Sequence, residues 1–205
     1  MTTLTRRALL VAAAALGLAL PAAAAPEPNA PAPLFTATDT AGQTVDLEGL
    51  KGRTVILEWT NHDCPFVIKH YGSGNMQAIQ RDATAGGAVW ISIISSAPGK
   101  QGHVSAARAD ELTIARNATP SHVVLDPEGT IGKMYRAVTT PQMFVIDAAG
   151  QIVFMGGIDD KPTANPADIP TATNYVRAAL EAIAAGTSPA VQSARPYGCA
   201  VRYAS

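Results

Sequence analysis

Short, continuously apolar runs alternate along the chain with segments whose apolar residues recur at helical spacing. Apolar runs rich in β-branched residues are typical of strands that are buried in a sheet. Three such runs lie at residues 54–60, 89–94 and 122–126. Two further runs, 143–146 and 151–155, are separated by a short turn sequence and predict two strands joined as a hairpin.

The segments between these runs predict helices. Residues 76–83 place their apolar side chains on one helical face, and helices are also expected over 105–116 and 173–185. A separate hairpin is expected at residues 35–47, before the first long strand. The order of strand, helix, strand and helix, followed by a hairpin and a helix, indicates an α/β fold. We expect a mixed sheet that is flanked by helices on both faces.

The chain has 205 residues, which is enough for one domain with a full core. The strand and helix pattern covers residues 34–186, which are expected to form that domain. A Pro-rich lead-in without core-forming residues precedes it at 26–33. An irregular tail follows at 187–205 and carries Cys199.

An export signal is predicted at residues 1–25. Arg6 and Arg7 provide a charged start, and the apolar stretch 8–20 is too short to span a bilayer comfortably. Small residues suited to cleavage follow at 22–25. The stretch around the two arginines partly matches a twin-arginine signal, with ordinary secretion and an uncleaved anchor as the alternatives. We expect a periplasmic or secreted protein with no stable membrane span once the signal is removed.

Charge and cysteine content narrow the classes of function. The formal net charge is −1 and charged residues make up 15% of the chain, without a Lys/Arg run, so binding to nucleic acid is not expected. The chain has 2 cysteines, Cys64 and Cys199. Because thiols outside the cytoplasm tend to pair, an intramolecular Cys64–Cys199 pair is the simplest expectation.

Cys64 stands at a predicted junction between a strand and a helix. It follows the apolar run 54–60, and Pro65 suits the first turn of a helix, where no backbone N–H donor is needed. A helix N-terminus favours negative charge, so we expect a lowered pKa and raised reactivity for the Cys64 thiol. His62 and His70 are candidate cationic neighbours. The alternative is an inert buried cysteine or one end of a structural disulfide.

Four segments carry a resemblance to a known fold: Trp59 to Val67 with Cys64 at its centre, Thr139-Thr140-Pro141, Gly156 to Asp160, and Tyr197-Gly198-Cys199. A cysteine at the first strand-to-helix crossing and a Thr-Pro pair before a later strand resemble the thioredoxin fold, over roughly residues 33–186. More closely, the chain resembles the redoxin branch. These are the peroxiredoxin-like relatives of the alkyl hydroperoxide reductase and thiol-specific antioxidant family.

The chain departs from two well-known branches of that fold at defined positions. Thioredoxins carry Cys-x-x-Cys, whereas here Cys64 matches the first cysteine and Val67 stands in place of the second. Typical peroxiredoxins carry Pro-x-x-x-Thr-x-x-Cys, whereas here Leu57 and Asn61 stand at the Pro and Thr positions. The resemblance therefore implies a reactive-cysteine scaffold whose second cysteine is Cys199.

The resemblance also implies roles for individual residues. Cys64 would be the nucleophile and Cys199 would resolve its adduct. Glu58 stands at the position of a buried Asp in thioredoxins, which resembles a proton acceptor for thiol exchange. Burial in a central strand would raise the pKa of the Glu58 carboxyl group. The alternative is that Glu58 is partly solvated and inert. Thr140-Pro141 matches the cis-Pro loop beside the active cysteine, with an ordinary trans proline as the alternative. The residues expected to contact the substrate are Trp59, Pro65, Phe66 and Thr140.

The expected function is two-electron thiol chemistry at Cys64. Its partner would be a protein thiol or disulfide, or a peroxide, with an unidentified reductant and no cofactor. One alternative is a copper-binding carrier, since His62, Cys64, His70 and Cys199 offer nitrogen and sulfur ligands, but their spacing forms no tight motif and no metal site is expected. The other alternative is a non-catalytic binding module in which a Cys64–Cys199 disulfide is purely structural.

Overall fold

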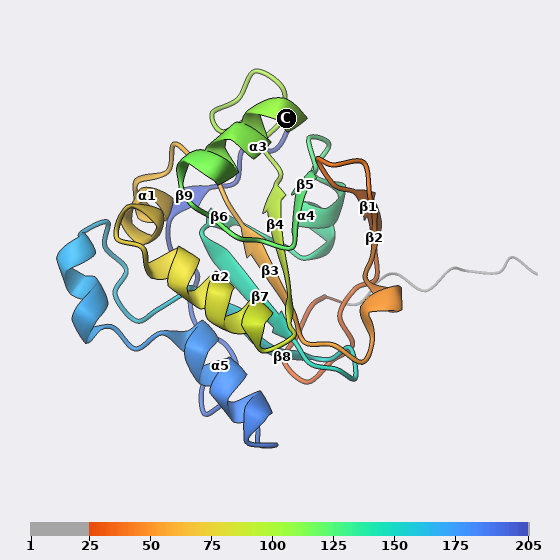
Figure 1. The fold of residues 1–205 in the computed structure, drawn as a ribbon, viewed down its shortest axis with the longest axis vertical. Helices are drawn as coiled ribbons and strands as arrows, with labels where there is room; N and C mark the ends of the chain where they lie inside the picture. Colours follow the sequence, from red (N-terminus) through yellow and green to blue (C-terminus); the bar gives the residue numbers. More distant parts are fainter. Residues whose placement is uncertain (1–24, 205) are drawn as a thin grey trace, which may run out of the picture.

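The computed structural model describes residues 25–204 and is built around a five-stranded sheet (Figure 1). Its strands, in sheet order, are β5 (His122–Leu125), β4 (Val89–Ile94), β3 (Val55–Trp59), β7 (Gln142–Ile146) and β8 (Ile152–Gly156). β3, β4 and β5 are parallel, whereas β7 is antiparallel to β3 and β8 is antiparallel to β7. The mixed sheet predicted from the sequence is confirmed. The predicted export signal lies, apart from Ala25, outside the described residues.

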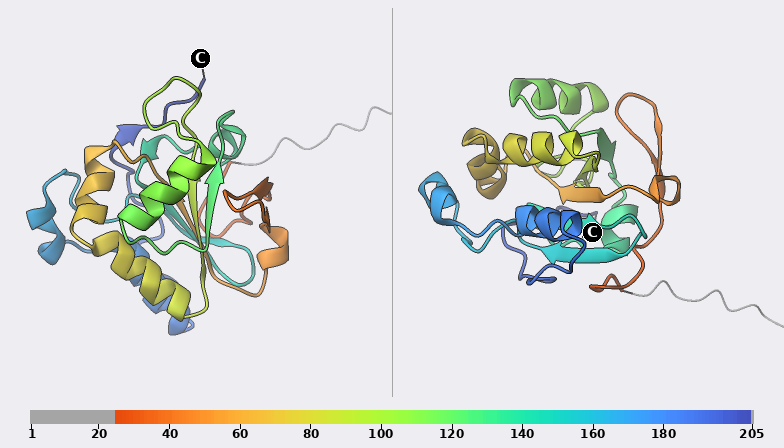
Figure 2. Two further views of the ribbon diagram at one scale, coloured as in Figure 1. Left: turned by 45° about the horizontal axis from the view of Figure 1, so that its top comes forward. Right: turned by 60° about the horizontal axis from the view of Figure 1, so that its bottom comes forward.

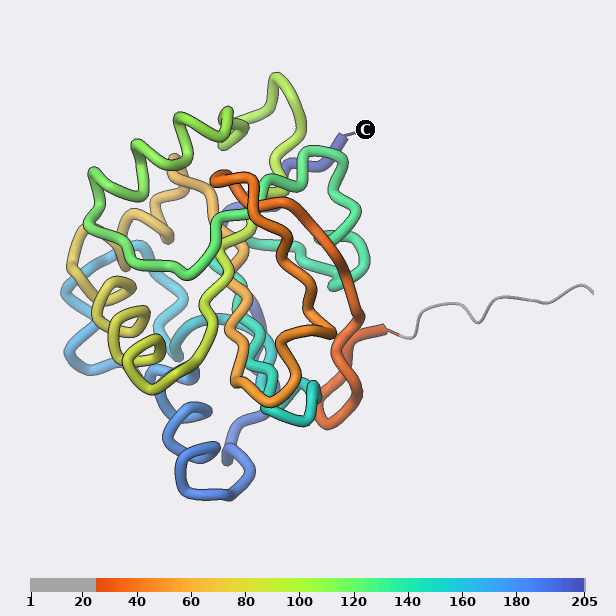
Figure 3. The backbone as a smooth tube through the Cα atoms, turned by 45° about the vertical axis from the view of Figure 1, so that its right-hand side comes forward, coloured from red at the N-terminus to blue at the C-terminus, as the bar shows by residue number. Residues whose placement is uncertain are grey.

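Helices cover both faces of this sheet. One face carries α1 (Pro65–Gly72), α2 (Asn75–Ala85), α3 (Ala106–Ala115) and α5 (Tyr175–Ala184). The other face carries α4 (Thr130–Met134) and the hairpin of β1 (Thr36–Thr38) and β2 (Thr44–Asp46), and Figures 2 and 3 show this hairpin and α2 on opposite sides. Two 3-10 turns, η1 (Glu48–Leu50) and η2 (Pro166–Thr171), complete the described helices. Within residues 25–204, no helix is both long and apolar enough to cross a bilayer.

Two apolar clusters fill the space on the two faces of the sheet. On the α4 face, Trp59, Tyr135 and Phe144 pack with ring centroids 5.1 to 5.4 Å apart. On the other face, the buried cluster contains the predicted apolar side of α2 together with Cys64. Because successive residues of a strand point to opposite faces, Trp59 and Glu58 of β3 face different clusters.

The Pro-rich lead-in packs along the edge of β8. The backbone N–H of Asn29 donates to the carbonyl of Ile152 at 2.7 Å, and the N–H of Ile152 donates to Ala30 at 2.9 Å. Ala32 is 5% exposed and belongs to the cluster on the α4 face. The expectation that this segment contributes no core residue is therefore wrong. An extended segment can satisfy the unpaired backbone groups of an edge strand, and this places its small side chains against the core.

The C-terminal tail contains a short strand that the sequence pattern does not predict. β9 (Cys199–Ala200) pairs antiparallel with β6 (Thr139–Thr140), which places Cys199 opposite Thr140. Figure 2 shows the blue β9 beside α1 at the same end of the sheet. Beyond β9, backbone bonds join the end of the tail to the domain, from Val201 to Val138 at 3.0 Å and from Ala97 to Arg202 at 2.8 Å. The tail is therefore ordered across the edge of the sheet where β3 ends.

Candidate functional site

Cys64 lies where the sequence places it, between β3 and α1. It is the N-cap of α1 in an extended conformation, and Pro65 occupies the first turn. Its side chain is completely buried, with 0% exposed. The Cys64 thiol donates a hydrogen bond to the carbonyl oxygen of Thr140 at 3.1 Å. The predicted placement of Cys64 at a helix N-terminus is thus confirmed, and backbone N–H groups there favour a negative charge.

The Thr140-Pro141 bond is cis, as the resemblance implied. Thr140 is buried, and its carbonyl oxygen is the acceptor for the Cys64 thiol. The loop between β6 and β7 therefore contacts the cysteine directly. This contact brings together two segments that are separated by 76 residues in the chain.

Cys199 lies beside Cys64, and both are free thiols. Gly198 has φ +138°, and a Cβ at this position would come within 2.0 Å of the Thr140 carbonyl oxygen, so the tail passes very close to the cis-Pro loop. Burial, followed by the hydrogen bond and charge of Cys64, raises the pKa of Cys199 to about 12. A tail cysteine in solvent would keep an ordinary pKa. The expectation of an irregular tail fails here because β9 packs Cys199 against the core.

The two histidines near Cys64 do not supply positive charge. Burial lowers the pKa of His62, and although Asp63 opposes this, Arg116 and Arg108 add to it. Burial likewise lowers the pKa of His70 to about 4. Both rings are therefore neutral at pH 7, and the expectation of cationic neighbours is wrong. The reason is tertiary packing, which the local sequence does not reveal.

Glu58 is fully buried at the centre of a hydrogen-bond network. Its carboxylate accepts from Ser92 Oγ at 2.8 Å, from Trp90 Nε1 at 2.9 Å and from Tyr71 Oη at 2.9 and 3.0 Å. Gln80 Nε2 donates at 3.4 Å. The alternative of a partly solvated strand-end residue is therefore wrong. These donors come from α1, α2 and β4, so Glu58 joins the elements that support Cys64, while the thiol itself bonds to Thr140.

The structure separates the residues expected to contact a substrate. Trp59 is completely buried on the α4 face, where its Nε1 donates to Ser95 Oγ at 3.1 Å, so it belongs to the core and not to a substrate surface. Thr140 is buried beneath the tail. Pro65 is exposed and Phe66 is half-buried, and these two remain available at the surface above Cys64.

A second buried cluster of ionisable groups joins α1 to the tail. Lys69 Nζ lies 3.6 Å from Asp159 Oδ2, with side-chain exposures of 0% and 1%. Tyr197 Oη donates to Asp159 Oδ1 and lies 3.4 Å from His70 Nε2. Asp159 and Tyr197 belong to two of the segments that resemble the redoxin family, but their residue types alone predict no role. The missed signal is their occurrence beside Gly157 and Gly198, where close packing of the backbone is required.

Three surface cavities lie at different distances from the cysteines. A groove of about 540 Å³ follows the tail from Ala194 to Gly198 and includes Thr139, whose buried Oγ1 has no hydrogen-bond partner. A second, also about 540 Å³, lies beside His62 and Ile68 on the outer side of α1. Both adjoin the Cys64 end of the sheet.

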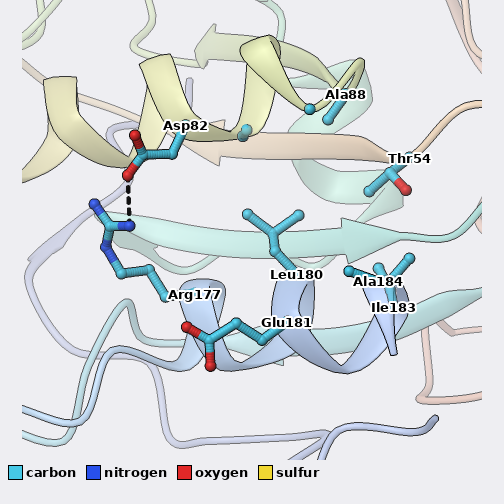
Figure 4. Close-up of a pocket in the computed structure, with 10 residues that line it drawn as sticks. Thr54, Asp82, Ala88, Arg177, Leu180, Glu181, Ile183 and Ala184 are labelled. Atoms are coloured by element: carbon cyan, nitrogen blue, oxygen red, sulfur yellow. Dashed lines mark hydrogen bonds and ion pairs between the residues drawn. The ribbon is translucent and has the colours of Figure 1, made fainter. Parts of the chain in front are cut away.

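The third cavity, of about 350 Å³, lies between α5 and the C-terminal part of α2 (Figure 4). An ion pair of 2.6 Å between Arg177 and Asp82 bounds it, and Leu180 and Ile183 supply apolar lining. Thr54, before β3, also lines it, whereas Cys64 follows β3. Since the five strand residues span about 17 Å, this cavity lies at the wrong end of the sheet for thiol chemistry.

The four residues considered for copper are not gathered in one place. His70 points to Asp159 and Tyr197, and His62 Nε2 lies 3.3 Å from Asp63 Oδ1. Across the described part of the chain, no group of three or more His, Cys, Asp or Glu side chains is placed to hold a metal ion.

Comparison with known proteins identifies a family and a fold. The profile described as the AhpC/TSA family matches residues 28–155. An uncharacterized conserved protein from Geobacillus kaustophilus is 22% identical, with a TM-score of 0.71, over 87% of this chain and 93% of its own. A hypothetical protein from Sinorhizobium meliloti 1021 is 20% identical, with a TM-score of 0.70, over 87% and 96%.

A putative thiol:disulfide interchange protein DsbE from Chlorobium tepidum is 21% identical, with a TM-score of 0.52, over 64% of this chain and 85% of its own. No curated protein matches the sequence. At these identities the structural neighbours establish the fold, which is thioredoxin-like.

Proposed function

This chain belongs to the AhpC/TSA family, and on that premise we propose that it is a thiol–disulfide oxidoreductase with Cys64 and Cys199 as its redox pair. One observation carries the proposal. The β6–β9 pairing places Cys199 opposite Thr140, whose carbonyl accepts the Cys64 hydrogen bond, so the 2 cysteines of the chain meet at one residue. The fold shared with a putative thiol:disulfide interchange protein supports the same conclusion.

The unequal surroundings of the two thiols support distinct roles. Cys64 caps a helix, where a thiolate is stabilised, whereas the pKa of Cys199 is raised to about 12. Cys64 is therefore the attacking thiolate in our proposal, and Cys199 is the resolving thiol, which remains protonated until Cys64 has reacted. Once the Cys64 charge is lost in an adduct, that contribution to the raised pKa of Cys199 is lost with it.

The proposed exchange is balanced in atoms and electrons. The Cys64 thiolate attacks one sulfur of a partner disulfide, the partner S–S bond breaks, and the second partner sulfur leaves and takes a proton. Cys199 then loses its proton and attacks Cys64 Sγ, which forms the Cys64–Cys199 bond and releases the first partner sulfur as a thiol. The partner gains two electrons and two protons, and this chain loses them. A thiol reductant returns the pair to the dithiol.

The surrounding residues act by positioning in this proposal. Glu58 is committed to its four hydrogen-bond donors and holds α1, α2 and β4 together beneath Cys64. Thr140 and Pro141 hold the backbone that contacts both cysteines. Pro65 and Phe66 form the surface that a partner protein would meet first.

The test is the reduction potential of the pair, combined with trapping of the intermediate. We expect a potential of about −120 to −270 mV, and we expect Cys199→Ser to trap a mixed disulfide at Cys64 that Cys64→Ser does not form. A potential below about −300 mV, with no trapped adduct, would identify the pair as a structural disulfide. Tight copper that disappears in Cys64→Ser would favour the carrier.

Peroxide is the second candidate oxidant, favoured by the complete burial of Cys64. A peroxide needs a smaller opening beneath the tail than a protein disulfide does. Attack by the Cys64 thiolate would give a sulfenic acid and release water or an alcohol, and Cys199 would then displace the sulfenic hydroxyl as water to form the disulfide. A sulfenic acid trapped in Cys199→Ser by peroxide, together with no mixed disulfide when the same variant is treated with a protein disulfide, would select this reaction.

We also propose that the mature chain works outside the cytoplasm, where its pair would be exposed to an oxidising environment. The support is the charged start and short apolar stretch within residues 1–25. Intact mass of exported material should lack roughly the first 24 residues, and a mass that includes Met1 would contradict cleavage.

A further inference from the structure

We propose that Tyr197 is a positioning residue that docks the tail onto α1 through the buried cluster of Lys69, His70 and Asp159. Through this docking, the cluster sets how readily Cys64 and Cys199 form their disulfide. The inference rests on the proposed redox pairing and adds the element that controls its equilibrium. None of these four residues takes part in the sulfur chemistry itself.

Tyr197 is well placed to control Cys199 because it lies two residues before it. Gly198, between them, is held against the Thr140 carbonyl. The ring of Tyr197 is packed from two sides, since its centroid lies 5.8 Å from the Phe66 ring, and a Cβ on Gly157 would come within 3.0 Å of the ring. Because Gly198 alone separates this ring from Cys199 in the chain, fixing the ring restrains the position of Cys199.

The docking surface is on the same helix that Cys64 caps. Phe66, Lys69 and His70 all belong to α1, and each contacts Tyr197 or its acceptor Asp159. The nucleophile and the anchor of the resolving cysteine are thus held by one rigid element. Groups placed on a rigid helix keep their separation more closely than groups on separate loops.

The cluster resists opening because its charges are buried and depend on one another. Asp159 faces Lys69 at 3.6 Å and receives the Lys161 backbone N–H at 2.9 Å as well as the Tyr197 hydroxyl. His70 is held from its other side by Asn75 at 2.8 Å. If the tail lifted away, the buried Asp159 carboxylate would lose a hydrogen-bond donor, which is unfavourable for a charge that has little access to water.

Docking in the dithiol state raises the effective concentration of Cys199 at Cys64. A free tail would have to lose conformational freedom when the disulfide forms, whereas a docked tail has already lost it. Weakening the dock should therefore make the disulfide easier to reduce. It should leave the chemistry of an isolated thiol unchanged.

The experiment uses the full mature chain equilibrated with glutathione redox buffers, comparing wild type with Tyr197→Phe. We expect Tyr197→Phe to lower the equilibrium constant for disulfide formation about tenfold. For a two-electron couple, this raises the reduction potential of the pair by about 30 mV. Tyr175→Phe is the matched control, because Tyr175 lines the same groove and its hydroxyl has no hydrogen-bond partner among residues 25–204. The control should match wild type.

A second measurement separates positioning from general stability. Positioning predicts that Tyr197→Phe reduces the unfolding free energy of the oxidised form more than that of the reduced form, whereas a purely structural role reduces both equally. Phe66→Leu weakens the same dock without touching a buried charge, and it should shift the equilibrium in the same direction by a smaller factor. It therefore keeps the inference testable if Tyr197→Phe does not fold.

The two proposals fail in different ways. If wild type shows no exchange and no trapped adduct, the redox function is wrong. If wild type exchanges normally but Tyr197→Phe retains the wild-type equilibrium constant, the positioning role of Tyr197 is overturned. If Tyr197→Phe does not fold, an unchanged equilibrium constant in Phe66→Leu overturns it instead.

Discussion

The thiol of Cys64 and the carbonyl oxygen of Thr140 are 3.1 Å apart, although 76 residues separate them in the chain. Thr140 is also the residue that faces Cys199 across the β6–β9 pair. One backbone residue therefore contacts both cysteine segments. This arrangement explains how a cysteine of the domain and a cysteine of the C-terminal tail meet without any shared sequence motif.

Both thiols of the native, reduced protein should react slowly with iodoacetamide at neutral pH. Cys64 is shielded because none of its surface is exposed. Cys199 is limited by ionisation, because a pKa raised from 9.0 to about 12 leaves about a thousandfold less thiolate at pH 7. Mass spectrometry of labelled peptides should show slow labelling of both sites in buffer and fast labelling in urea. Rapid labelling of Cys64 in buffer would show that the tail does not cover the site in solution, and rapid labelling of Cys199 would show that its pKa is not raised.

Removing the Glu58 carboxylate should destabilise the domain. Glu58→Ala leaves buried donors on Tyr71, Trp90 and Ser92 without an acceptor, and we expect the free energy of unfolding to fall by about 3 kcal/mol or more. Glu58→Gln retains one acceptor oxygen and should cost less. Urea unfolding measures both effects. The control is Glu48→Ala, at an exposed ion pair, which should change the free energy of unfolding by less than about 0.5 kcal/mol.

The pH profile of disulfide exchange distinguishes positioning by Glu58 from proton transfer. If Glu58 acts only through packing, Glu58→Gln keeps the wild-type profile while lowering stability. A profile whose acidic limb disappears in Glu58→Gln would instead assign the carboxylate a direct role in proton transfer.

Local features of the site could be predicted from sequence, because they depend on neighbours in the chain. A buried strand followed by Cys64-Pro65 is enough to place the thiol at a helix N-terminus. Burial by residues that are distant in the chain could not be predicted in this way, because nothing in the sequence near His70 shows that Asp159 and Tyr197 will enclose it. The same limit applies to Trp59, whose aromatic ring suits either a substrate surface or a core and whose direction depends on which face of β3 it occupies.

The tail is the clearest case of a structure that sequence reasoning does not reach. A two-residue strand has no periodicity, and its partner, Thr139–Thr140, is equally short. The pairing is determined instead by close packing of Gly198 on Thr140 and by the hydroxyl of Tyr197. The resemblance to redoxins identifies these residues as a group, but only the three-dimensional contacts assign them a role.

Stability should decrease as the pH falls from about 6.5 to about 4. Burial, opposed by Asp159 and assisted by Lys69, lowers the pKa of His70 from 6.5 to about 4. Between these values the unfolded chain binds a proton that the folded chain does not, so acid favours unfolding. The full effect is about 3 kcal/mol and levels off below pH 4. The lowered pKa of His62 acts in the same direction.

Urea unfolding at pH 7 and at pH 5 measures this dependence. His70→Gln should flatten it, whatever its effect on absolute stability, because the substituted residue does not titrate. His103→Gln removes a histidine from an exposed position and should keep the wild-type slope. Equal slopes for wild type and His70→Gln would show that His70 is not buried in its neutral form.

Gly198→Ala should separate Cys199 from Cys64. The φ of +138° is rarely adopted by residues with a side chain, and an added Cβ would meet the Thr140 carbonyl oxygen at 2.0 Å and its carbon at 2.7 Å. Both atoms belong to the backbone, so no side chain can move aside, and the β6–β9 pair must open. We expect intramolecular disulfide formation to slow by about tenfold or more as effective concentration is lost. Gly72→Ala is the control, since a Cβ there meets nothing within 4 Å. Stopped-flow oxidation followed by acid quenching and mass spectrometry gives the rate of ring closure. An unchanged rate in Gly198→Ala would mean that Cys199 reaches Cys64 without the β6–β9 pairing, and that the contact at Thr140 does not bring the two thiols together.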